Sequence, residues 1–494
     1  FAHQLPTYLG AVINFIVNDP VLAFNIVCFI GIVLSNFFFY RFLRLYLSPY
    51  FAFFGTVLFN FAPYRIVNLF IRGAIPETFS SFLLPLALIG IHMWLKQKNA
   101  LGFFLLVTVL FGLIMTHPMM LVTYMFIIGP YLLFMILTEF EDHLDSRTFF
   151  TKKSIQVLIL FGVGAGIALG MAGYYVIPLN LEIKYFYYGA EQNHLVKNHF
   201  MHLANFFDPN WYYFYRDDIF PRGHFIKSGL PEILVLITGG VYIVINRIRN
   251  KKYTAKPTIL ELFVLIGGGI VFMTTQYAEI VYKAVSFLGN IQFPWRMMSA
   301  FIFVPPIIAA LLMKKINKPV IAFIILLFFV SLRYPQLYGK NYTQYPLSEY
   351  LVTVNNLHSN NMNTIWTGET QSYPEREIQT QIIGGQGTVE KTEVSNSWRK
   401  YTVNAQTPVQ LVDYTFYFPG WRVYVDGVEK DIQFQDPNYR GVITYAVEQG
   451  THEVVLRFED TKIRFISKVI TVLFLGLFVV LFLVRKKLKQ FILA

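Results

Sequence analysis

Long apolar runs separated by short basic loops constrain this 494-residue chain more than any other feature. A helix needs about 20 apolar residues to cross roughly 30 Å of hydrocarbon. The pattern predicts a polytopic all-α membrane protein with about eleven transmembrane helices. The second span is short, and residues 100–138 could be divided differently. The predicted spans are 21–40, 49–63, 75–95, 100–116, 119–138, 155–178, 230–246, 258–275, 297–313, 319–333 and 465–484.

The composition excludes several classes of protein. Only 14% of the residues are charged, whereas soluble domains carry roughly 25%, so a soluble cytoplasmic enzyme is excluded. The 18% of aromatic residues is untypical of a disordered chain. The single cysteine, Cys28, excludes a disulfide framework and a cysteine-rich metal site.

The basic residues indicate the orientation of the chain in the membrane. The net charge of +12 could suggest a nucleic-acid partner, but the placement of the charges favours topology instead. If all eleven spans form, the basic clusters fall in alternate loops on one side, which the positive-inside rule makes the cytoplasm. The C-terminus is then cytoplasmic and Phe1 lies outside. These clusters contain Arg41, Arg44, Lys96, Lys98, Arg147, Lys152, Lys153, Arg247, Arg249, Lys251, Lys252, Lys256, Lys314, Lys315, Lys318, Arg485, Lys486, Lys487 and Lys489.

The start of the chain is unusual for a protein of this class. It begins at Phe1, without a methionine, a signal peptide or an early apolar run. Because the predicted topology puts Phe1 outside, an earlier span is needed to bring the chain there. We therefore expect an N-terminally truncated fragment whose missing segment holds at least one more helix.

The remaining segments divide the chain into three parts. Residues 1–333 form a multi-span domain with outward loops, which include residues 1–20 and a long loop over 179–229. Residues 334–464 form an extracytoplasmic domain, and 465–494 a final helix with a basic tail. From about residue 380 apolar and polar residues alternate between turn signals such as Asp426-Gly427. This period of two predicts an antiparallel β domain, interpreted as a small sandwich.

The segment over residues 64–77 contains the most informative polar residues. It sets Arg65, Arg72 and Glu77 among apolar residues at the predicted outer interface. Arginine presents a planar fork of donors that suits phosphate or carboxylate, and a nearby carboxylate could act as a base or bind a sugar hydroxyl. The alternative is that the arginines extend to lipid headgroups while Glu77 caps a helix. That alternative fits one arginine better than it fits all three residues together.

Trp295 and Arg296 precede the span that begins at residue 297. Arg296 could bind a phosphate, and Trp295 could stack on a sugar or a lipid. An interfacial aromatic belt with an arginine extending to the headgroups explains the same residues. Taken alone, Trp295 and Arg296 are better explained as part of such a belt than as a binding site.

Other polar residues give weaker signals. His117 lies at a break between two spans, where it could donate a proton, although a hydrogen-bonded corner histidine is the commoner case. In the long loop Glu182 is a candidate for substrate binding, and His199, His202 and Asp208 could bind a divalent metal. Their spacing matches no tight metal motif, so no residue is assigned as a metal ligand and no cofactor is certain. Phosphate-loop, Ser-His-Asp and HExxH signatures are absent.

Several motifs together resemble a known family. The run APYRIVNLFIRGAIPETFSSFLLPLALIGIH is similar to the pattern of bacterial polytopic proteins called 6-pyruvoyl-tetrahydropterin synthase-related membrane proteins. THPMM, YYVIPLNLEIKYF and IQFPWR fit that pattern in the same order. FYFPGWRVYVDG and GTHEVVLRFED, followed by a final span, resemble the YfhO-type membrane proteins. Soluble pterin synthases hold zinc with histidines, and no such arrangement is present here, so pterin chemistry is not implied.

The resemblance implies a fold and a site. The family architecture is similar to the GT-C glycosyltransferase fold, in which outward loops bind a sugar carried on polyprenyl phosphate. In that fold the catalytic acid lies in the first outward loop, which places it upstream of Phe1 in this chain. The catalytic residue is therefore unknown, and Glu77 and His117 are the candidates present. Substrate-binding candidates are Arg65, Arg72, Glu77, Glu182, Trp295 and Arg296.

The predicted function is transfer of a sugar from a polyprenyl-phosphate donor to a cell-envelope acceptor on the outer face of the bacterial plasma membrane. A transporter or flippase of lipid-linked saccharide, and a non-catalytic envelope scaffold, are the alternatives. Intramembrane ionisable residues are few, with His92 and Glu261 the main ones, and this scarcity favours the transferase. Tyr417, Trp421 and Tyr424 could guide a glycan acceptor, although packing within the sandwich is the favoured interpretation.

Overall fold

The computed structural model describes residues 4–140, 151–186, 199–207, 229–250, 256–333, 364–367, 379–395 and 397–492. These residues belong to two compact units. The helical unit takes its residues from 1–172, 192–340 and 471–494, and the β unit takes its residues from 173–191 and 341–470. Each unit is described by itself.

Apolar helices build the helical unit. Among the described residues, seven helical stretches are long and apolar enough to cross a membrane. An eighth forms if the bent pair of α3 (Pro49–Asn60) with α4 (Pro63–Ile66) and the π-helix η1 (Val67–Ile71) counts as one span, with a 53° bend. The seven are α2 (Pro20–Leu43), α5 with α6 (Ile75–Ser80, Leu83–Leu95), α8 (Pro118–Glu139), α9 (Lys152–Met171), α13 (Leu230–Asn250), the run η6, α16 and α17 (Pro294–Met297, Met298–Phe301, Val304–Ile316), and α20 (Lys462–Leu483).

Each of the eleven predicted spans overlaps a helix. The three that are neither long helices nor the bent pair fall on α7 (Ala100–Thr116), α14 (Ile259–Thr274) and α18 (Pro319–Arg333), which have 17, 16 and 15 residues. At about 1.5 Å per residue these helices are shorter than the hydrocarbon core. The total of eleven therefore stays a prediction, and the described residues contain seven helical stretches whose length and composition would allow each to cross a membrane.

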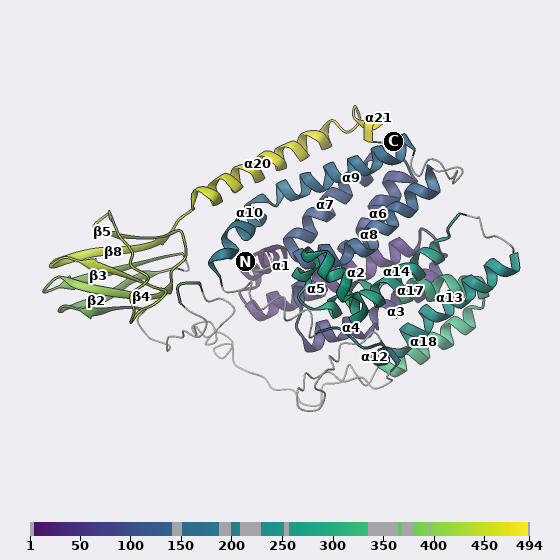
Figure 1. Cartoon of the computed structure of the whole chain (residues 1–494), viewed down its shortest axis with the longest axis horizontal. Helices are drawn as coiled ribbons and strands as arrows, with labels where there is room; N and C mark the ends of the chain where they lie inside the picture. The colour runs from purple at the N-terminus through teal and green to yellow at the C-terminus, as the bar shows by residue number, and fades with distance from the viewer. Residues whose placement is uncertain are drawn as a thin grey trace. The chain divides into compact units, whose positions relative to one another are not determined.

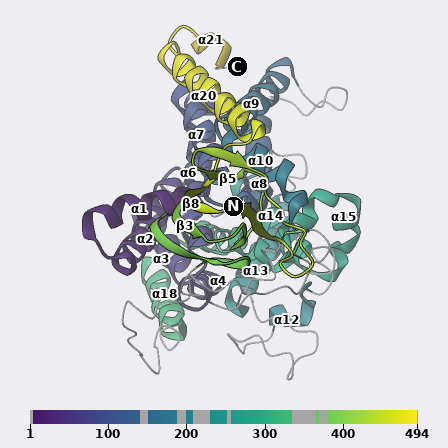
Figure 2. The same cartoon turned by 90° about the vertical axis from the view of Figure 1, so that its left-hand side faces the viewer.

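Several helices lie in segments that the sequence predicts as loops. Residues 1–20 were expected to form an outward loop, but α1 (Gln4–Val17) is a helix that packs beside α2, as Figure 2 shows. Its apolar residues recur at helical spacing, yet polar side chains such as Asn14 keep the run too short to read as a span. Helices α12 (Leu203–Phe207) and α15 (Glu279–Ala284) also lie outside the predicted spans, and α10 (Gly173–Glu182) begins within the predicted span 155–178 and continues past its end.

The helices with basic residues at their ends meet at one end of the helical unit. Lys314 Nζ donates to the carbonyl of Tyr46 at 2.9 Å, and Lys96 lies 3.8 Å from the carboxylate of Glu139. Helices α6, α7 and α8 run side by side between this end and the opposite one, where His117 links α7 to α8 (Figure 1). Basic residues that the sequence places in alternate loops therefore lie at the same end of the helical unit.

Small residues allow two of these helices to pack closely. A Cβ atom on Gly102 of α7 would lie 2.3 Å from the backbone nitrogen of Trp94 and 2.5 Å from the carbonyl oxygen of Gly90. Such close approach of backbones is how helices associate where lipid gives no hydrophobic driving force. An alanine at position 102 would force α6 and α7 apart.

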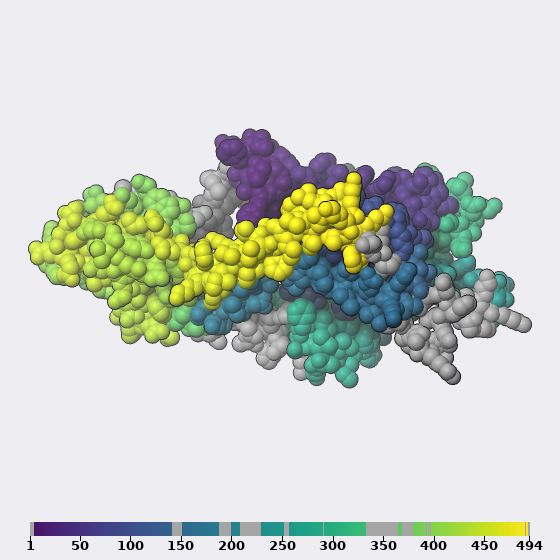
Figure 3. Space-filling model, turned by 90° about the horizontal axis from the view of Figure 1, so that it is seen from above, coloured from purple at the N-terminus to yellow at the C-terminus, as the bar shows by residue number. Residues whose placement is uncertain are grey.

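The C-terminal residues cover one side of the helical unit. Phe478 and Phe482 of α20 form edge-on contacts with Phe104, and the indole of Trp94 donates to the carbonyl of Ile492 in α21 (Lys489–Ile492) at 2.7 Å. In Figure 3 this stretch, in yellow, lies along the blue helices.

The β unit is a two-sheet antiparallel sandwich (Figure 1), as the alternation predicts. The sheet orders are β1-β4-β7 and β2-β3-β8-β5-β6. Side chains of both sheets, such as Leu411 of β4 and Val403 of β3, share one hydrophobic core. Asp426 and Gly427, both with positive φ, form the two-residue turn between β5 and β6. The strands are β1 (Thr380–Gly384), β2 (Gly387–Val394), β3 (Trp398–Ala405), β4 (Val409–Phe416), β5 (Trp421–Val425), β6 (Val428–Lys430), β7 (Val442–Val447) and β8 (Gly450–Phe458).

The aromatic residues considered for acceptor binding take part in the packing of the β unit. Tyr417 and Trp421 pack against the core, and Tyr417 stacks on Phe434 at a ring distance of 3.9 Å. Tyr424 donates a hydrogen bond to Glu459 at 2.9 Å. These contacts favour the structural interpretation of all three.

Candidate functional site

A bidentate ion pair between Arg72 and Glu77 lies at the centre of the candidate site in the helical unit. Arg72 Nη1 is 3.1 Å from Glu77 Oε2, and Nη2 is 3.2 Å from Oε1. The Glu77 side chain is 3% exposed and that of Arg72 is 23% exposed. The carboxylate is thus enclosed, while the guanidinium reaches the surface of the unit.

The local backbone brings these two side chains together. Arg72 follows directly after the π-helix η1, and its N–H donates to the carbonyl of Val67 at 2.9 Å. This wider turn aligns Asn68 with Arg72, so that Nη1 donates to the Asn68 side-chain oxygen at 2.5 Å. Gly73, with a φ of 56° that favours glycine, reverses the chain, and α5 then places Glu77 in its first turn. Isolated π turns are frequent at functional sites.

Uncharged donors hold the Glu77 carboxylate from three further directions. Oε2 accepts from Tyr64 Oη and Asn68 Nδ2, each at 3.0 Å, and from Ser299 Oγ at 3.2 Å. Because this oxygen also accepts from Arg72, its acceptor capacity is filled. Such a carboxylate is better suited to holding cations in place than to taking a proton as a general base.

Arg296 is the second cation of the site. Its Nε lies 3.6 Å from Glu77 Oε1, and its side chain is 13% exposed. Nη1 donates to the Gln292 side-chain oxygen at 2.7 Å and to the Ile291 carbonyl at 3.1 Å. Gln292 has a φ of 64°, an uncommon conformation for a residue other than glycine, and it aims its side chain at Arg296.

Trp295 connects the two cations through ring contacts. The Arg72 guanidinium lies 4.7 Å from the centre of the Trp295 ring, and Phe293 stacks parallel to Trp295 at 5.0 Å. Arg296 in turn lies 4.8 Å from the Phe293 ring. Since Trp295 is buried, this geometry favours holding Arg72 in position over stacking on a sugar. The site therefore presents two partly exposed guanidinium groups around one enclosed carboxylate, an excess of one positive charge.

The other candidate residues lie in different places. His117 caps α8, is buried, and interacts electrostatically with Glu77. Arg65 contacts Ser35 and Ser81 and lies beside a small cavity that Glu77 also lines. Glu182 belongs to the β unit, where it pairs with Arg464 at 2.9 Å.

The residues considered as possible ligands for a divalent metal fall only partly within the described part of the chain. Asp208 lies outside the described residues, and the His199 ring packs edge-on against Phe293 at 4.7 Å. The described residues contain no group of three histidine, cysteine or acidic side chains that could hold a metal ion.

Sequence reasoning missed three residues of the site. Tyr64 and Asn68 lie within the segment that we singled out, but an uncharged side chain gives no signal of its own there. Ser299 is inside a predicted span and 222 positions from Glu77. The i, i+4 spacing of Asn68 and Arg72 was the one available signal, because such residues face each other on a helix.

Comparison with known families identifies the class of membrane protein. Residues 3–338 match the family described as 6-pyruvoyl-tetrahydropterin synthase related domain, membrane protein. The match covers more than half of the chain and includes the whole Arg72–Glu77–Arg296 cluster. The chain belongs to this family. Neither the comparison with curated proteins nor that with solved structures gives a match.

Proposed function

We propose that the protein is a GT-C-like membrane glycosyltransferase. It moves a sugar from a polyprenyl-phosphate donor to a cell-envelope acceptor at the outer face of the bacterial plasma membrane. The observation that carries the proposal is the pairing of two partly exposed guanidinium groups with one enclosed carboxylate. Arginine forks bind phosphate oxygens through two parallel hydrogen bonds, and the excess charge suits an anionic lipid headgroup.

The position of the cluster supports a lipid-linked ligand. It lies at the helix ends opposite to those that carry the basic clusters, which the positive-inside rule assigns to the cytoplasm. In the proposed orientation the cluster and the β unit are both extracytoplasmic and the C-terminus is cytoplasmic. Polyprenyl phosphate would keep its chain in the bilayer while its headgroup reaches the arginines.

The proposed chemistry gives each group a role. A hydroxyl oxygen of the acceptor attacks the anomeric carbon of the sugar, the bond from that carbon to the phosphate oxygen breaks, and the hydroxyl proton passes to the departing phosphate. Arg72 and Arg296 stabilise the negative charge that develops on the departing polyprenyl phosphate, the kind of electrostatic stabilisation that dominates many enzymes. Glu77 holds the two arginines in position, and His117 orients the sugar or the acceptor.

A transporter of lipid-linked saccharide is the second candidate, because the break between α3 and η1 is typical of transporter spans. Within the described spans, however, the ionisable groups far from the cluster are engaged locally. His92 lies 3.5 Å from the hydroxyls of Tyr46 and Tyr131, and Glu261 pairs with Arg247. This arrangement favours chemistry at one face over passage through the bilayer.

The test uses full-length protein in membranes supplied with radiolabelled polyprenyl-phosphate sugar. Transfer to a glycan acceptor should fall by about 100-fold or more in Arg72→Ala, the usual cost of removing a donor that stabilises developing charge. Arg485→Ala is the matched control, because it removes a guanidinium that lies 4.3 Å from the Phe482 ring at the basic end of the unit. Unaltered transfer in Arg72→Ala would remove this residue from the site. Movement of the intact donor across the bilayer without sugar transfer would contradict the glycosyltransferase proposal and support the transporter.

A further inference from the structure

Arg65 is a buried cation that has no ion-pair partner in the described part of the chain. Arg65 is 5% exposed, and the nearby Glu77 carboxylate forms its ion pairs with Arg72 and Arg296 instead. Nη2 donates to Ser35 Oγ at 2.7 Å and Nη1 to Ser81 Oγ at 3.3 Å, and the guanidinium lies 4.3 Å from the Phe59 ring. These groups offer partial charges only. A charge inside a membrane span marks a functional site by default, with its counter-charge to be identified.

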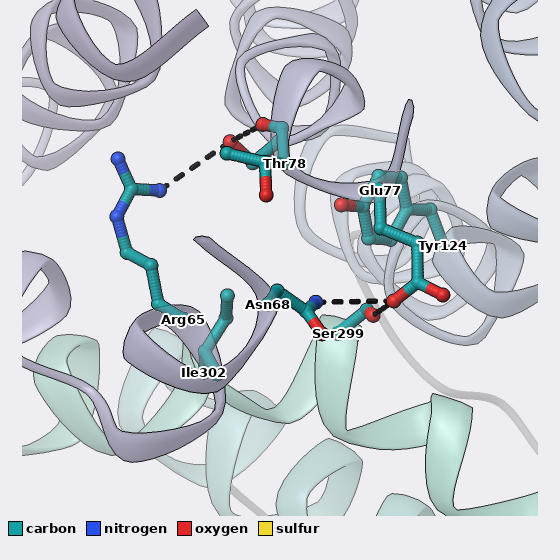
Figure 4. A pocket seen from close by; sticks show the side chains of 8 residues that line it. Arg65, Asn68, Glu77, Thr78, Tyr124, Ser299 and Ile302 are labelled. Atoms are coloured by element: carbon teal, nitrogen blue, oxygen red, sulfur yellow. Dashed lines mark hydrogen bonds between the residues drawn. The ribbon is translucent and has the colours of Figure 1, made fainter. Parts of the chain in front are cut away.

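A small cavity lies beside Arg65. Figure 4 shows Arg65 on one side of it and Glu77 on the other. The remaining lining is rich in hydroxyl and amide donors, and the free space holds about one water molecule. The lining residues are Arg65, Asn68, Glu77, Thr78, Ser81, Tyr124, Ser299 and Ile302.

A buried hydroxyl in this lining has no partner of its own. Thr78 is 5% exposed, and its Oγ1 makes no hydrogen bond to any residue that the structure describes. A buried polar group left without a partner costs about 1–3 kcal/mol, so its retention beside an unpaired guanidinium points to a ligand that accepts hydrogen bonds. The Glu77 carboxylate does not serve this purpose, because it is occupied by Arg72 and Arg296.

Two charged side chains line the cavity, Arg65 and Glu77, and the charge of Glu77 is already neutralised by Arg72 and Arg296. Burying an uncompensated charge costs several kcal/mol. Arg72 and Arg296 are partly exposed, so solvent or a headgroup can stabilise their charges, whereas Arg65 is enclosed. The missing counter-charge of Arg65 must therefore be small enough to lie inside the cavity.

We propose that the cavity binds a single halide-sized anion, chloride under cellular conditions, between the Arg65 guanidinium and the Thr78 hydroxyl. A guanidinium with hydroxyl and amide donors suits a monatomic anion, and the free space is too small for phosphate. The anion neutralises Arg65 and leaves the Arg72–Glu77–Arg296 cluster available for its own ligand. The inference does not depend on the glycosyltransferase proposal.

The test measures the thermal midpoint of the full-length protein in detergent micelles. Sodium gluconate is replaced by sodium chloride, bromide, iodide or phosphate at constant ionic strength. A ligand that binds only the folded state raises its stability by mass action, so the midpoint should rise on the order of 3 °C in chloride. Bromide should act similarly, iodide more weakly because of its size, and phosphate should have no effect.

Two variants locate the effect. Thr78→Val should require about tenfold more chloride for the same shift, the equivalent of one hydrogen bond, and Arg65→Gln should abolish the shift. Thr108→Val is the matched control, because the Thr108 hydroxyl bonds the Phe104 carbonyl in α7, away from this cavity. If Arg65→Gln does not fold, the wild-type anion series and Thr78→Val decide the question.

Three outcomes would overturn the proposal. Equal midpoints in gluconate and chloride would mean that a water molecule alone fills the cavity. A shift in phosphate without one in chloride would assign Arg65 to the headgroup site. A full chloride shift in Arg65→Gln would place the anion elsewhere.

Discussion

The helical unit and the β unit each hold a buried carboxylate in an ion pair with arginine, and the two clusters differ in charge balance and in what surrounds them. In the β unit, Arg399 of β3 donates to Asp413 of β4 at 2.8 Å and so joins the two sheets. Thr380 and Thr415 hydrogen-bond the same two side chains. In the helical unit, two arginines share Glu77, and a third lies across a cavity from it.

This difference distinguishes a structural pair from a binding cluster. The β-unit pair is balanced one to one, and its side chains are 10% and 0% exposed. The cluster at Glu77 carries excess positive charge, its arginines are partly exposed, and its backbone includes a π turn and a strained Gln292. Strain and unbalanced charge persist where a ligand compensates for them.

The largest expected effect on stability is that of Glu77→Gln. Removing the carboxylate leaves Arg72 and Arg296 without their shared counter-charge, so the free energy of unfolding should fall by about 3–5 kcal/mol. Denaturation of the full-length protein in mixed micelles, followed by tryptophan fluorescence, measures the change.

The matched control for that change is Glu139→Gln. Its pair with Lys96 is longer, at 3.8 Å, and the Lys96 side chain is 53% exposed, so the loss should stay below about 1 kcal/mol. Equal losses in the two variants would contradict the assignment of Glu77 as the carboxylate that holds the cluster together.

The second prediction separates the two clusters by paired replacement. Asp413→Asn alone should reduce the stability of the sandwich by about 3 kcal/mol, because Arg399 stays buried without its partner. Arg399→Met combined with Asp413→Leu should come within about 1 kcal/mol of the wild type, since balanced buried pairs are often replaceable by apolar residues. Hydrogen exchange of strands β3 and β4 in the full chain gives the local free energies.

The same paired change in the helical unit should fail. Arg72→Met with Glu77→Leu leaves Arg296 without a carboxylate, so this double variant should remain destabilised by about 3 kcal/mol. A helical double variant as stable as the β-unit double would show that both clusters are structural pairs.

The smallest effect concerns pH at an exposed turn of the β unit. His452 Nδ1 lies 2.6 Å from Asp426 Oδ2, and this hydrogen bond raises the pKa of His452. A histidine whose pKa is raised on folding contributes stability that is fully present below the unfolded pKa, about 6.5, and is lost as the pH rises through the folded value. Protection of the β5–β6 turn from hydrogen exchange, corrected for intrinsic rates, should therefore decrease slightly from pH 6 to pH 8.

His452→Gln should remove this dependence and leave the strands intact. An unchanged pH profile in that variant would assign the titration to another group. The test also extends the comparison of ion pairs. The stability lost by raising the pH at this partly exposed pair should be much smaller than the stability lost by substitution at a buried pair.

The sequence predicted much of this arrangement, and its failures have identifiable causes. The alternation from residue 380 onward predicted the sandwich, because every second side chain of a half-buried strand must be apolar. Arg65, Arg72 and Glu77 stood out because charged residues are costly among apolar ones. The different environments of Arg65 and Arg72 were not predictable, since they depend on Ser35 and Ser299, which lie on helices distant in the sequence.

By itself, the sequence determined that the chain has several runs long and apolar enough to span a membrane, where its basic residues cluster, and which arginines are candidates for binding an anion. These properties follow from apolar run length, charge placement and residue type, all of which are local along the chain. Only the tertiary structure decided that Arg72 and Arg296 share Glu77, that Arg65 is left alone beside a cavity, and that Glu182 belongs to another unit. These partnerships depend on how helices pack, and packing brings together residues whose separation along the chain carries no signal.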